Sequence, residues 1–353
     1  MAALKGVIGP MVMGRRADLI GATAKMLDER VHNHLLAKGA VDMAMWDILG
    51  KHLKVPVHSL LGGLQHDKFS LLWPFGAFPP DVDPAAAVQA KIDEGYDTFM
   101  LKTGGSSQGP EEAVTVVKKI NASLGDRITR DIHINVDANQ GWTVPQAKAF
   151  LQGISGQRLS FVEQPLHARD EWALPELRRA GSHAISADEG IKTAGDALRL
   201  ASGHLVDVFS LKASKNGGIT RCMAVANIAA AAGVPILCNS MIELGITQAA
   251  LLHVAAVLPN LVDGGHCFMS TLRLKDDVTD FGRLITRPDT GTAAAAPPGG
   301  PALGGEEEKL SGRVCVSVPL DAPGLGVALD MEKLEKYSLS RVEVLSESES
   351  TAN

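Results

Sequence analysis

Short apolar runs alternate with longer amphipathic stretches along most of the chain. Four stretches carry apolar residues at clear helical spacing, at residues 85–94, 111–124, 144–153 and 219–232. The apolar runs lie at residues 69–73, 98–102, 133–137, 160–163, 184–188, 206–212, 235–239 and, with a weaker pattern, 263–268. This alternation is typical of βα units around a parallel sheet. Eight units favour an α/β fold of the (β/α)8 type, a modified TIM barrel, over a doubly wound sheet.

The two ends of the chain have different patterns. Residues 18–49 carry apolar positions at helical spacing, interrupted by Gly39, and prolines and glycines then punctuate residues 55–63. A stretch rich in Ala, Pro, Gly and Glu begins near residue 289 and predicts a surface insertion. We predict capping helices at residues 1–66, a barrel at 67–288 and a low-complexity insertion at 289–312. A C-terminal segment that returns to the cap follows at 313–345, and a disordered tail at 346–353.

Composition narrows the classes of function. The 353 residues are 45% hydrophobic, which is enough for a large core. The net charge of −6 comes from 40 acidic and 34 basic residues without a basic stripe, which argues against nucleic acid as a partner. No apolar run reaches the roughly 18 residues of a membrane span, and no signal-peptide pattern is present, so we expect a soluble cytoplasmic protein. The four cysteines show no CxxC spacing, and we expect free thiols.

Five predicted strands end on a charged residue. These residues are Lys102, Asp137, Glu163, Asp188 and Lys212, separated by 35, 26, 25 and 24 positions, or about one βα repeat each time. The carboxyl ends of barrel strands meet at one rim, and active sites of such barrels lie there. We therefore expect the five side chains to converge on one cavity.

The types of these five residues predict a chemistry. Three carboxylates in a buried cavity need a cation, and their hard oxygens suit Mg2+, so we expect Asp137, Glu163 and Asp188 to hold one Mg2+ per subunit. Such a cation can bind a substrate carboxylate and stabilise the enolate formed when an α-proton leaves. Lys102 and Lys212 would reach the cavity from opposite sides, one to remove a proton and one to return it. Burial beside a divalent cation is expected to bring a lysine pKa from about 10.4 toward ~7–8.

The segments around these residues resemble one family. They are VDAN at 136–139, VEQP at 162–165, ADE at 187–189 and LKASKNGGIT at 211–220, together with residues 40–63 and 323–327. Over most of the chain they resemble the mandelate racemase and muconate lactonizing enzyme branch of the enolase superfamily, and the muconate lactonizing subgroup most. The resemblance implies Asp137, Glu163 and Asp188 as metal ligands and Lys212 as a catalytic lysine. The mandelate racemase subgroup itself has a His–Asp dyad where this sequence has Lys212 and Asn239.

Two features depart from the resembled pattern. The family's second-strand motif is Lys-x-Lys, whereas this sequence has Met100 two positions before the implied base Lys102. In addition, only 46 residues reach Trp46, so we expect the N-terminal antiparallel strands and their specificity loop to be missing. The predicted α+β capping domain is therefore incomplete.

Further residues are candidates for substrate contact or for orienting the ligands. Asn139, Gln164 and Glu189 follow the ligand candidates, which usually need such partners, and Glu189 is also an alternative ligand to Asp188. Trp73 offers an aromatic face to a cationic or apolar group, or else packs beneath the cap. Glu243, near the end of the seventh strand, is open to substrate contact or to a surface salt bridge.

These residues predict racemisation or epimerisation of an amino-acid derivative, with a small-molecule carboxylate as substrate. The same groups would also serve a dehydratase acting on a hydroxy acid or hydroxyproline, or a cycloisomerase. A catalytically inactive barrel is the alternative from a different class, because Met100 and the short cap depart from the family pattern. The resembled family commonly forms oligomers, and we expect a homo-oligomer.

Overall fold

The computed structural model describes residues 2–104, 109–288 and 310–339. The predicted tail, and the predicted insertion except for residues 310–312, lie outside these ranges.

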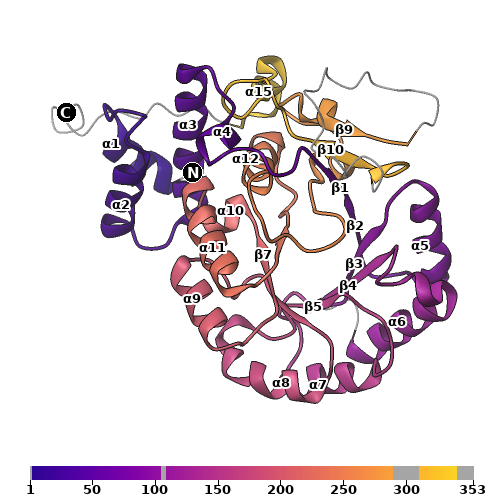
Figure 1. Cartoon of the computed structure of the whole chain (residues 1–353). Coiled ribbons are helices and arrows are strands. Elements are labelled where there is room, and N and C mark those ends of the chain that lie inside the picture. The colour runs from indigo at the N-terminus through magenta and orange to yellow at the C-terminus, as the bar shows by residue number, and fades with distance from the viewer. Residues whose placement is uncertain (1, 105–108, 289–309, 340–353) are drawn as a thin grey trace.

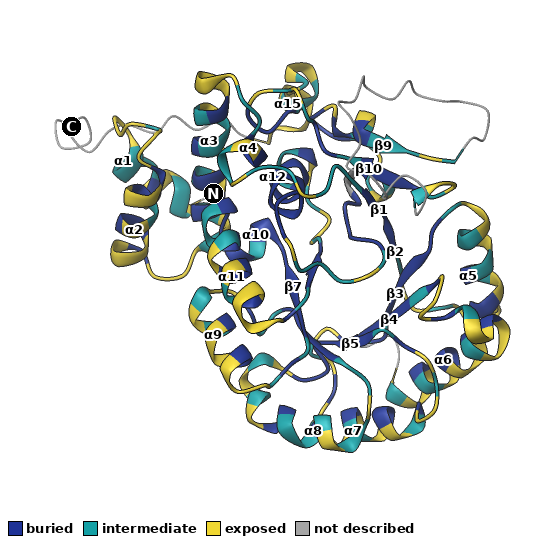
Figure 2. Cartoon of the chain, in the orientation of Figure 1, coloured by how far each residue is buried: buried dark blue, intermediate teal, exposed yellow. Residues whose placement is uncertain are grey.

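Seven parallel strands form a curled sheet in chain order (Figure 1). They are β2 (Leu72–Phe75), β3 (Thr98–Lys102), β4 (His133–Asp137), β5 (Phe161–Glu163), β6 (Ile185–Ala187), β7 (Val208–Leu211) and β8 (Ile236–Cys238). The helices after these strands are α5 (Pro84–Asp93), α6 (Pro110–Leu124), α7 (Val144–Gly153), α8 (Leu174–Ala180), α9 (Ala194–Ser202), α10 (Ala213–Asn216), α11 (Ile219–Ala232) and α12 (Gly245–Ala255). The sheet is buried, and the outer helices bury one face and expose the other (Figure 2). The predicted barrel class is confirmed, and the four predicted helices match within one residue at each end.

An irregular stretch, residues 260–269, completes the ring where the sequence pattern predicted an eighth strand. We call it the closing segment. Its backbone is hydrogen-bonded to β8 on one side and to the first barrel strand on the other, with N···O distances of 2.8 to 3.0 Å. Gly265 permits this approach, because a Cβ there would lie 2.7 Å from the carbonyl carbon of Leu71. The segment therefore fills the eighth position without regular strand geometry.

The first predicted strand is divided between two sheets. Its beginning is β1 (Lys68–Ser70), which pairs antiparallel with β10 (Cys315–Ser317), and β10 pairs in turn with β9 (Ile285–Thr286). Only β2 enters the barrel, where it pairs with β3. The chain crosses between the sheets at Leu71, whose N–H bonds to Val314 O at 2.9 Å.

The N-terminal helices pack beside the barrel as a cap. They are a π-helical turn (Leu4–Ile8), α1 (Gly9–Val12), α2 (Ile20–Arg30), α3 (Leu35–Leu53) and α4 (Val57–Leu60), and no strand occurs within described residues 2–67. Helix α3 lies against the end of the loop that leads from Lys212 into α11, because Thr220 N, in the first turn of α11, donates to Asp42 Oδ2 at 3.0 Å. At the other end of α3, Leu325 N donates to Asp47 Oδ1 at 2.9 Å. The cap thus contacts both the sixth βα loop and the C-terminal segment.

The remaining elements are short. They are 3-10 turns at Gly125–Arg127, Ala168–Ala173 and Phe281–Leu284, with α13 (Ser270–Arg273) and α15 (Met331–Tyr337). The four cysteines are buried free thiols, as predicted. Among the helices in the described ranges, none has the length and apolar character needed to cross a membrane.

Candidate active site

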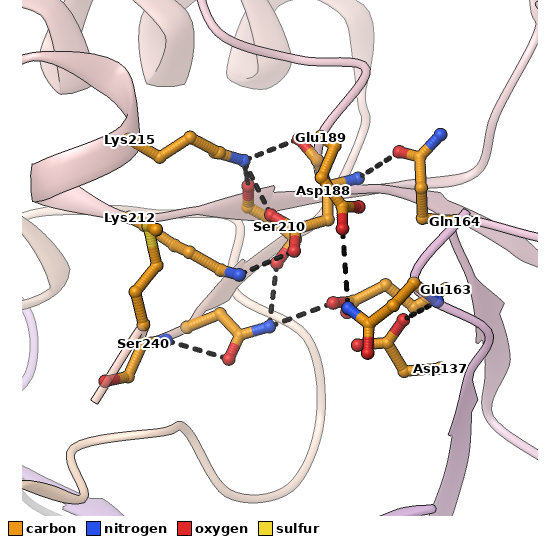
Figure 3. A network of polar contacts seen from close by, with 12 residues as sticks. Asp137, Glu163, Gln164, Asp188, Glu189, Ser210, Lys212, Lys215 and Ser240 are labelled. Carbon is orange, nitrogen blue, oxygen red and sulfur yellow. Dashed lines mark hydrogen bonds and ion pairs between the residues drawn. The ribbon is translucent and has the colours of Figure 1, made fainter. Parts of the chain in front are cut away.

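The five charged residues predicted from the strand ends lie at one end of the barrel. Lys102, Asp137 and Glu163 end β3, β4 and β5, and Asp188 and Lys212 directly follow β6 and β7. The sheet register places Lys102 beside Asp137 and Asp137 beside Glu163. Figure 3 shows Asp137, Glu163 and Asp188 on neighbouring strands, with Lys212 reaching Asp188 from the next one.

A cavity of about 530 Å³ opens at this rim. It is lined by Lys102 and Lys212, and also by Asp188, Glu189 and Asn139. Its volume lies within the range that small-molecule sites occupy. The cavity and the predicted site therefore coincide.

Each of the two lysines pairs with a carboxylate. Lys102 Nζ donates to Asp137 Oδ2, and Lys212 Nζ donates to Asp188 Oδ2 at 2.5 Å. Burial alone would lower both lysine pKa values, but the surrounding carboxylates, Glu163 included, outweigh it and raise the pKa of each. These raised pKa values are opposite in direction to the lowered pKa expected for a lysine base beside a divalent cation. As they stand, both lysines serve as cations that neutralise the acids.

Asp137, Glu163 and Asp188 form a group that we call the acidic cluster. Glu163 lies on the strand between the other two and is fully buried. Burial, together with the carboxylates of Asp137 and Asp188, raises the pKa of Glu163 well above its usual value. Its Oε1 accepts a hydrogen bond from Asn239 Nδ2 at 3.0 Å. Its Oε2 is buried and has no hydrogen-bond partner in the described structure. A buried carboxylate oxygen left in this state fits a ligand for a cation.

Lys215, which the sequence left open to substrate contact or a surface salt bridge, is a buried residue of the site. Its side chain is only 8% exposed, and its Nζ donates to Asp188 Oδ1 at 2.8 Å and to the carbonyl oxygens of Asp188 and Ser210 at 2.7 Å (Figure 3). Burial would raise the pKa of Asp188, but Lys215 and Lys212 outweigh it and hold that pKa at about 2. Lys215 lies in the short helix α10, which begins directly after Lys212.

Gln164 and Asn139 orient the residues around them. Gln164 Oε1 accepts from the backbone N–H groups of Asp188 and Gly190, at 2.8 and 3.0 Å, and thereby ties β5 to the end of β6. Asn139 N donates to Asp137 Oδ1 at 2.8 Å, and Asn139 Nδ2 donates to Glu189 Oε1 at 3.4 Å. Both residues have positive φ, 36° for Gln164 and 43° for Asn139, so the chain turns sharply beyond each carboxylate.

Glu189, the alternative ligand, also faces the cavity. Burial and the charge of Asp188 raise the pKa of Glu189, and its Oε2 has no hydrogen-bond partner in the described part of the chain. Unlike Asp188, it forms no ion pair with Lys212 or Lys215 in the described structure.

Two candidates for substrate contact do not line the cavity. Trp73 points toward the outer helix α5, where Lys91 Nζ lies 4.0 Å from the centre of its ring, whereas its neighbours Leu72 and Pro74 line the cavity. The indole ring packs edge-on against Tyr96, with centroids 5.1 Å apart. Glu243 instead organises the loop after β8, accepting bonds from Ser240 Oγ (2.6 Å), Met241 N (2.8 Å) and Gln248 Nε2 (2.9 Å).

The acidic cluster is not a ready-made metal site. No three His, Cys, Asp or Glu side chains in residues 2–104, 109–288 and 310–339 are grouped so that they could hold an ion as they stand. We attribute this to the lysine ammonium groups, which take Asp137 and Asp188 as partners. The unpaired oxygen and raised pKa of Glu163 nevertheless fit a hard divalent cation, which would replace ammonium groups as the partner of the carboxylates.

Comparison with known families decides the relationship. Residues 83–333 match the model described as enolase C-terminal domain-like, and residues 1–62 match the N-terminal domain of mandelate racemase / muconate lactonizing enzymes. The chain belongs to the mandelate racemase / muconate lactonizing enzyme family. The resemblance inferred from the strand-end motifs is thereby confirmed.

Relatives in this family differ in reaction. The chain is 30% identical over 257 residues to the chloromuconate cycloisomerase of Pseudomonas sp. (strain P51), covering 73% of this chain and 68% of the relative. It is 34% identical over 228 residues to the hydrophobic dipeptide epimerase of Enterococcus faecalis, covering 64% and 61%. It is 30% identical over 253 residues to the N-succinyl-L-Arg/Lys racemase of Bacillus cereus, covering 71% and 66%.

A solved structure of a muconate lactonizing enzyme has the same fold as this chain. The muconate lactonizing enzyme from Pseudomonas putida superposes with a TM-score of 0.79 at 27% identity, over 95% of this chain and 84% of that chain. Together with the sequence relatives, this similarity shows that the chain is an isomerase-type enzyme of the enolase superfamily.

Proposed function

We propose that this enzyme removes the proton α to a substrate carboxylate and returns a proton to the opposite face, racemising or epimerising an amino-acid derivative. The observation that carries the proposal is the placement of Lys102 and Lys212. The ring has eight positions, seven strands and the closing segment, and β3 and β7 are four positions apart. The two ammonium groups therefore approach the cavity from opposite sides, with the acidic cluster on the strands between them.

Asp137, Glu163 and Asp188 are the residues that would hold a divalent cation, and hard carboxylate oxygens suit Mg2+. When bound, such a cation takes the substrate carboxylate and offsets the negative charge that develops as the α-proton leaves. Glu189 is the alternative to Asp188 in this set, since it has an unpaired buried oxygen at the same cavity.

The chain's own groups supply the proton transfers. Lys102 and Lys212 each have one carboxylate partner, and release of that carboxylate removes a contact that raises the pKa of the lysine. The lysine that gives its own proton to solvent can then, as a neutral amine, take the α-proton, and the other lysine, as an ammonium group, can deliver a proton to the α-carbon. Removal of the α-proton by one lysine and delivery of a proton by the other, from the opposite face, inverts the stereocentre. Lys215 is bound to three acceptors, and Gln164 to the backbone of Asp188, so both hold the acidic cluster in place while the protons move.

Proton NMR in deuterated water with Mg2+ tests the proposal. The panel comprises N-acylamino acids, dipeptides, proline derivatives and sugar acids, together with cis,cis-muconate. Loss of an α-proton signal from a compound that racemises supports the proposal, and new vinyl signals point instead to elimination. Lactone formation from muconate would favour cycloisomerisation, the second candidate, which the chloromuconate cycloisomerase relatives suggest. No exchange of any compound would contradict proton abstraction and favour an inactive barrel.

A further inference from the structure

The ring around the cavity has a charged half and an apolar half. Strands β4 to β7 and the residues that directly follow them carry the acidic cluster, Lys212 and Lys215. On the other side, beyond β8, the closing segment, β2 and β3 present Leu72, Met100, Cys267 and Met269 to the cavity. These four side chains belong to one buried cluster at the centre of the barrel, and we call them the apolar wall.

The apolar wall offers no acceptor for a positive charge. Leu72, Met100 and Met269 are each 1% exposed, so their hydrocarbon and thioether groups are packed rather than free to move aside. Charged side chains that line the cavity from this half, within the described residues, are Lys102 and Arg273, and both are cations. Carboxylates among the described lining residues are Asp188 and Glu189, which follow β6 in the charged half.

We propose that the apolar wall sets the substrate class, selecting a carboxylate whose side chain is apolar and carries no ammonium or guanidinium group. The inference rests on the proposed function and narrows it. An apolar side chain gains by leaving water against this wall. An ammonium group there would lose its water without gaining an acceptor, and Lys102 and Arg273 would repel it. Met100 contributes to this selection at a position where the resembled second-strand motif has a lysine.

A matched pair of compounds tests the selection. N-acetyl-L-norleucine and N-acetyl-L-ornithine have side chains of equal length that end in a methyl and an ammonium group. The expected ratio of kcat/KM for α-proton exchange, with Mg2+ in deuterated water, is at least about tenfold in favour of norleucine. Met269→Asp, which places a carboxylate in the wall, is expected to lower that ratio at least about tenfold, while Met269→Leu keeps it. Met331→Asp makes the same change at an exposed position on α15 and should leave the ratio unchanged.

The outcomes separate this inference from the function on which it rests. Exchange of ornithine as fast as norleucine would overturn the role of the wall and leave the proton chemistry standing. Exchange of neither compound, nor of any in the wider panel, would overturn the proposed function. The selection by the apolar wall can then be tested through binding alone, from the rise in Tm that each compound produces with Mg2+. Equal rises would contradict the selection, and a larger rise with N-acetyl-L-norleucine would support it.

Discussion

Asn239 Nδ2 donates to Glu163 Oε1 at 3.0 Å and leaves Glu163 Oε2 buried without a hydrogen-bond partner in the described structure. The same amide donates to Ser210 Oγ at 3.0 Å, which fixes the orientation of Asn239 and so of the carboxylate. An unpaired buried carboxylate oxygen destabilises the fold unless a cation binds it. The acidic cluster is therefore arranged for a ligand at the expense of the stability of the free protein.

The variant Glu163→Gln should separate the destabilisation of the free protein from the binding of the cation. Replacing the buried carboxyl group, whose ionised form burial and Asp137 and Asp188 disfavour, by a neutral amide should raise the free energy of unfolding without metal by about 1–3 kcal/mol. Mg2+ at a hundred times its Kd should stabilise the wild type by about 2.7 kcal/mol and the variant hardly at all. Urea unfolding with and without Mg2+ measures both. Glu176→Gln, at a surface pair with Lys148, is the control. Full Mg2+ stabilisation of the Glu163 variant would show that this carboxylate is not a ligand.

Lys215→Met should be strongly destabilising. It removes three donated hydrogen bonds and leaves Asp188 with one fewer cation in a buried position, a change that costs about 3–5 kcal/mol. Lys148→Met breaks an ion pair with Glu176 near the surface and should cost much less, because solvent screens that pair. Denaturant unfolding of the two variants makes the comparison. Similar small losses in both would mean that Lys215 does not hold Asp188 in place.

Stability should fall as pH drops below about 6.5, in part because of His266. Its Nδ1 accepts a hydrogen bond from Cys238 N at 3.1 Å, and burial lowers its pKa from near 6.5 to about 3. Between these values the unfolded chain binds a proton that the folded chain excludes, so acid favours unfolding. The contribution is about 1.4 kcal/mol between pH 7.5 and 5.5.

The histidine variant isolates this contribution. The loss in unfolding free energy between pH 7.5 and 5.5 should be smaller in His266→Gln than in the wild type by about 1.4 kcal/mol. Urea unfolding at both pH values gives the difference, and His52→Gln, at an exposed position, is the matched control. An unchanged pH dependence in His266→Gln would contradict the lowered pKa.

The sequence predicted the barrel and the convergence of the charged residues because both follow from local repeats. Amphipathic stretches and apolar runs have periods that can be counted, and the strand ends of successive βα units meet at one rim. Lys102, Asp137 and Glu163 end their strands at the predicted residues for this reason.

Features that depend on the approach of distant segments could not be predicted in this way. The closing segment takes its place through backbone bonds to β8 and β2 and the close contact of Gly265 with Leu71, and none of these leaves an alternating pattern. The outward direction of Trp73 depends on where β1 ends and β2 begins. The charge on the lysines depends on which carboxylate each one meets, which only the packed structure decides.

The central claim is that Lys102 and Lys212 act on opposite faces of one substrate carbon. The most direct measurement is α-proton exchange in deuterated water, for both enantiomers of the panel compound that exchanges fastest, with Lys102→Met and Lys212→Met. Each variant should lose exchange of one enantiomer by about 10²–10⁴-fold and retain exchange of the other, with the affected enantiomer differing between the two variants. Exchange of both enantiomers at the wild-type rate in either variant would contradict the claim.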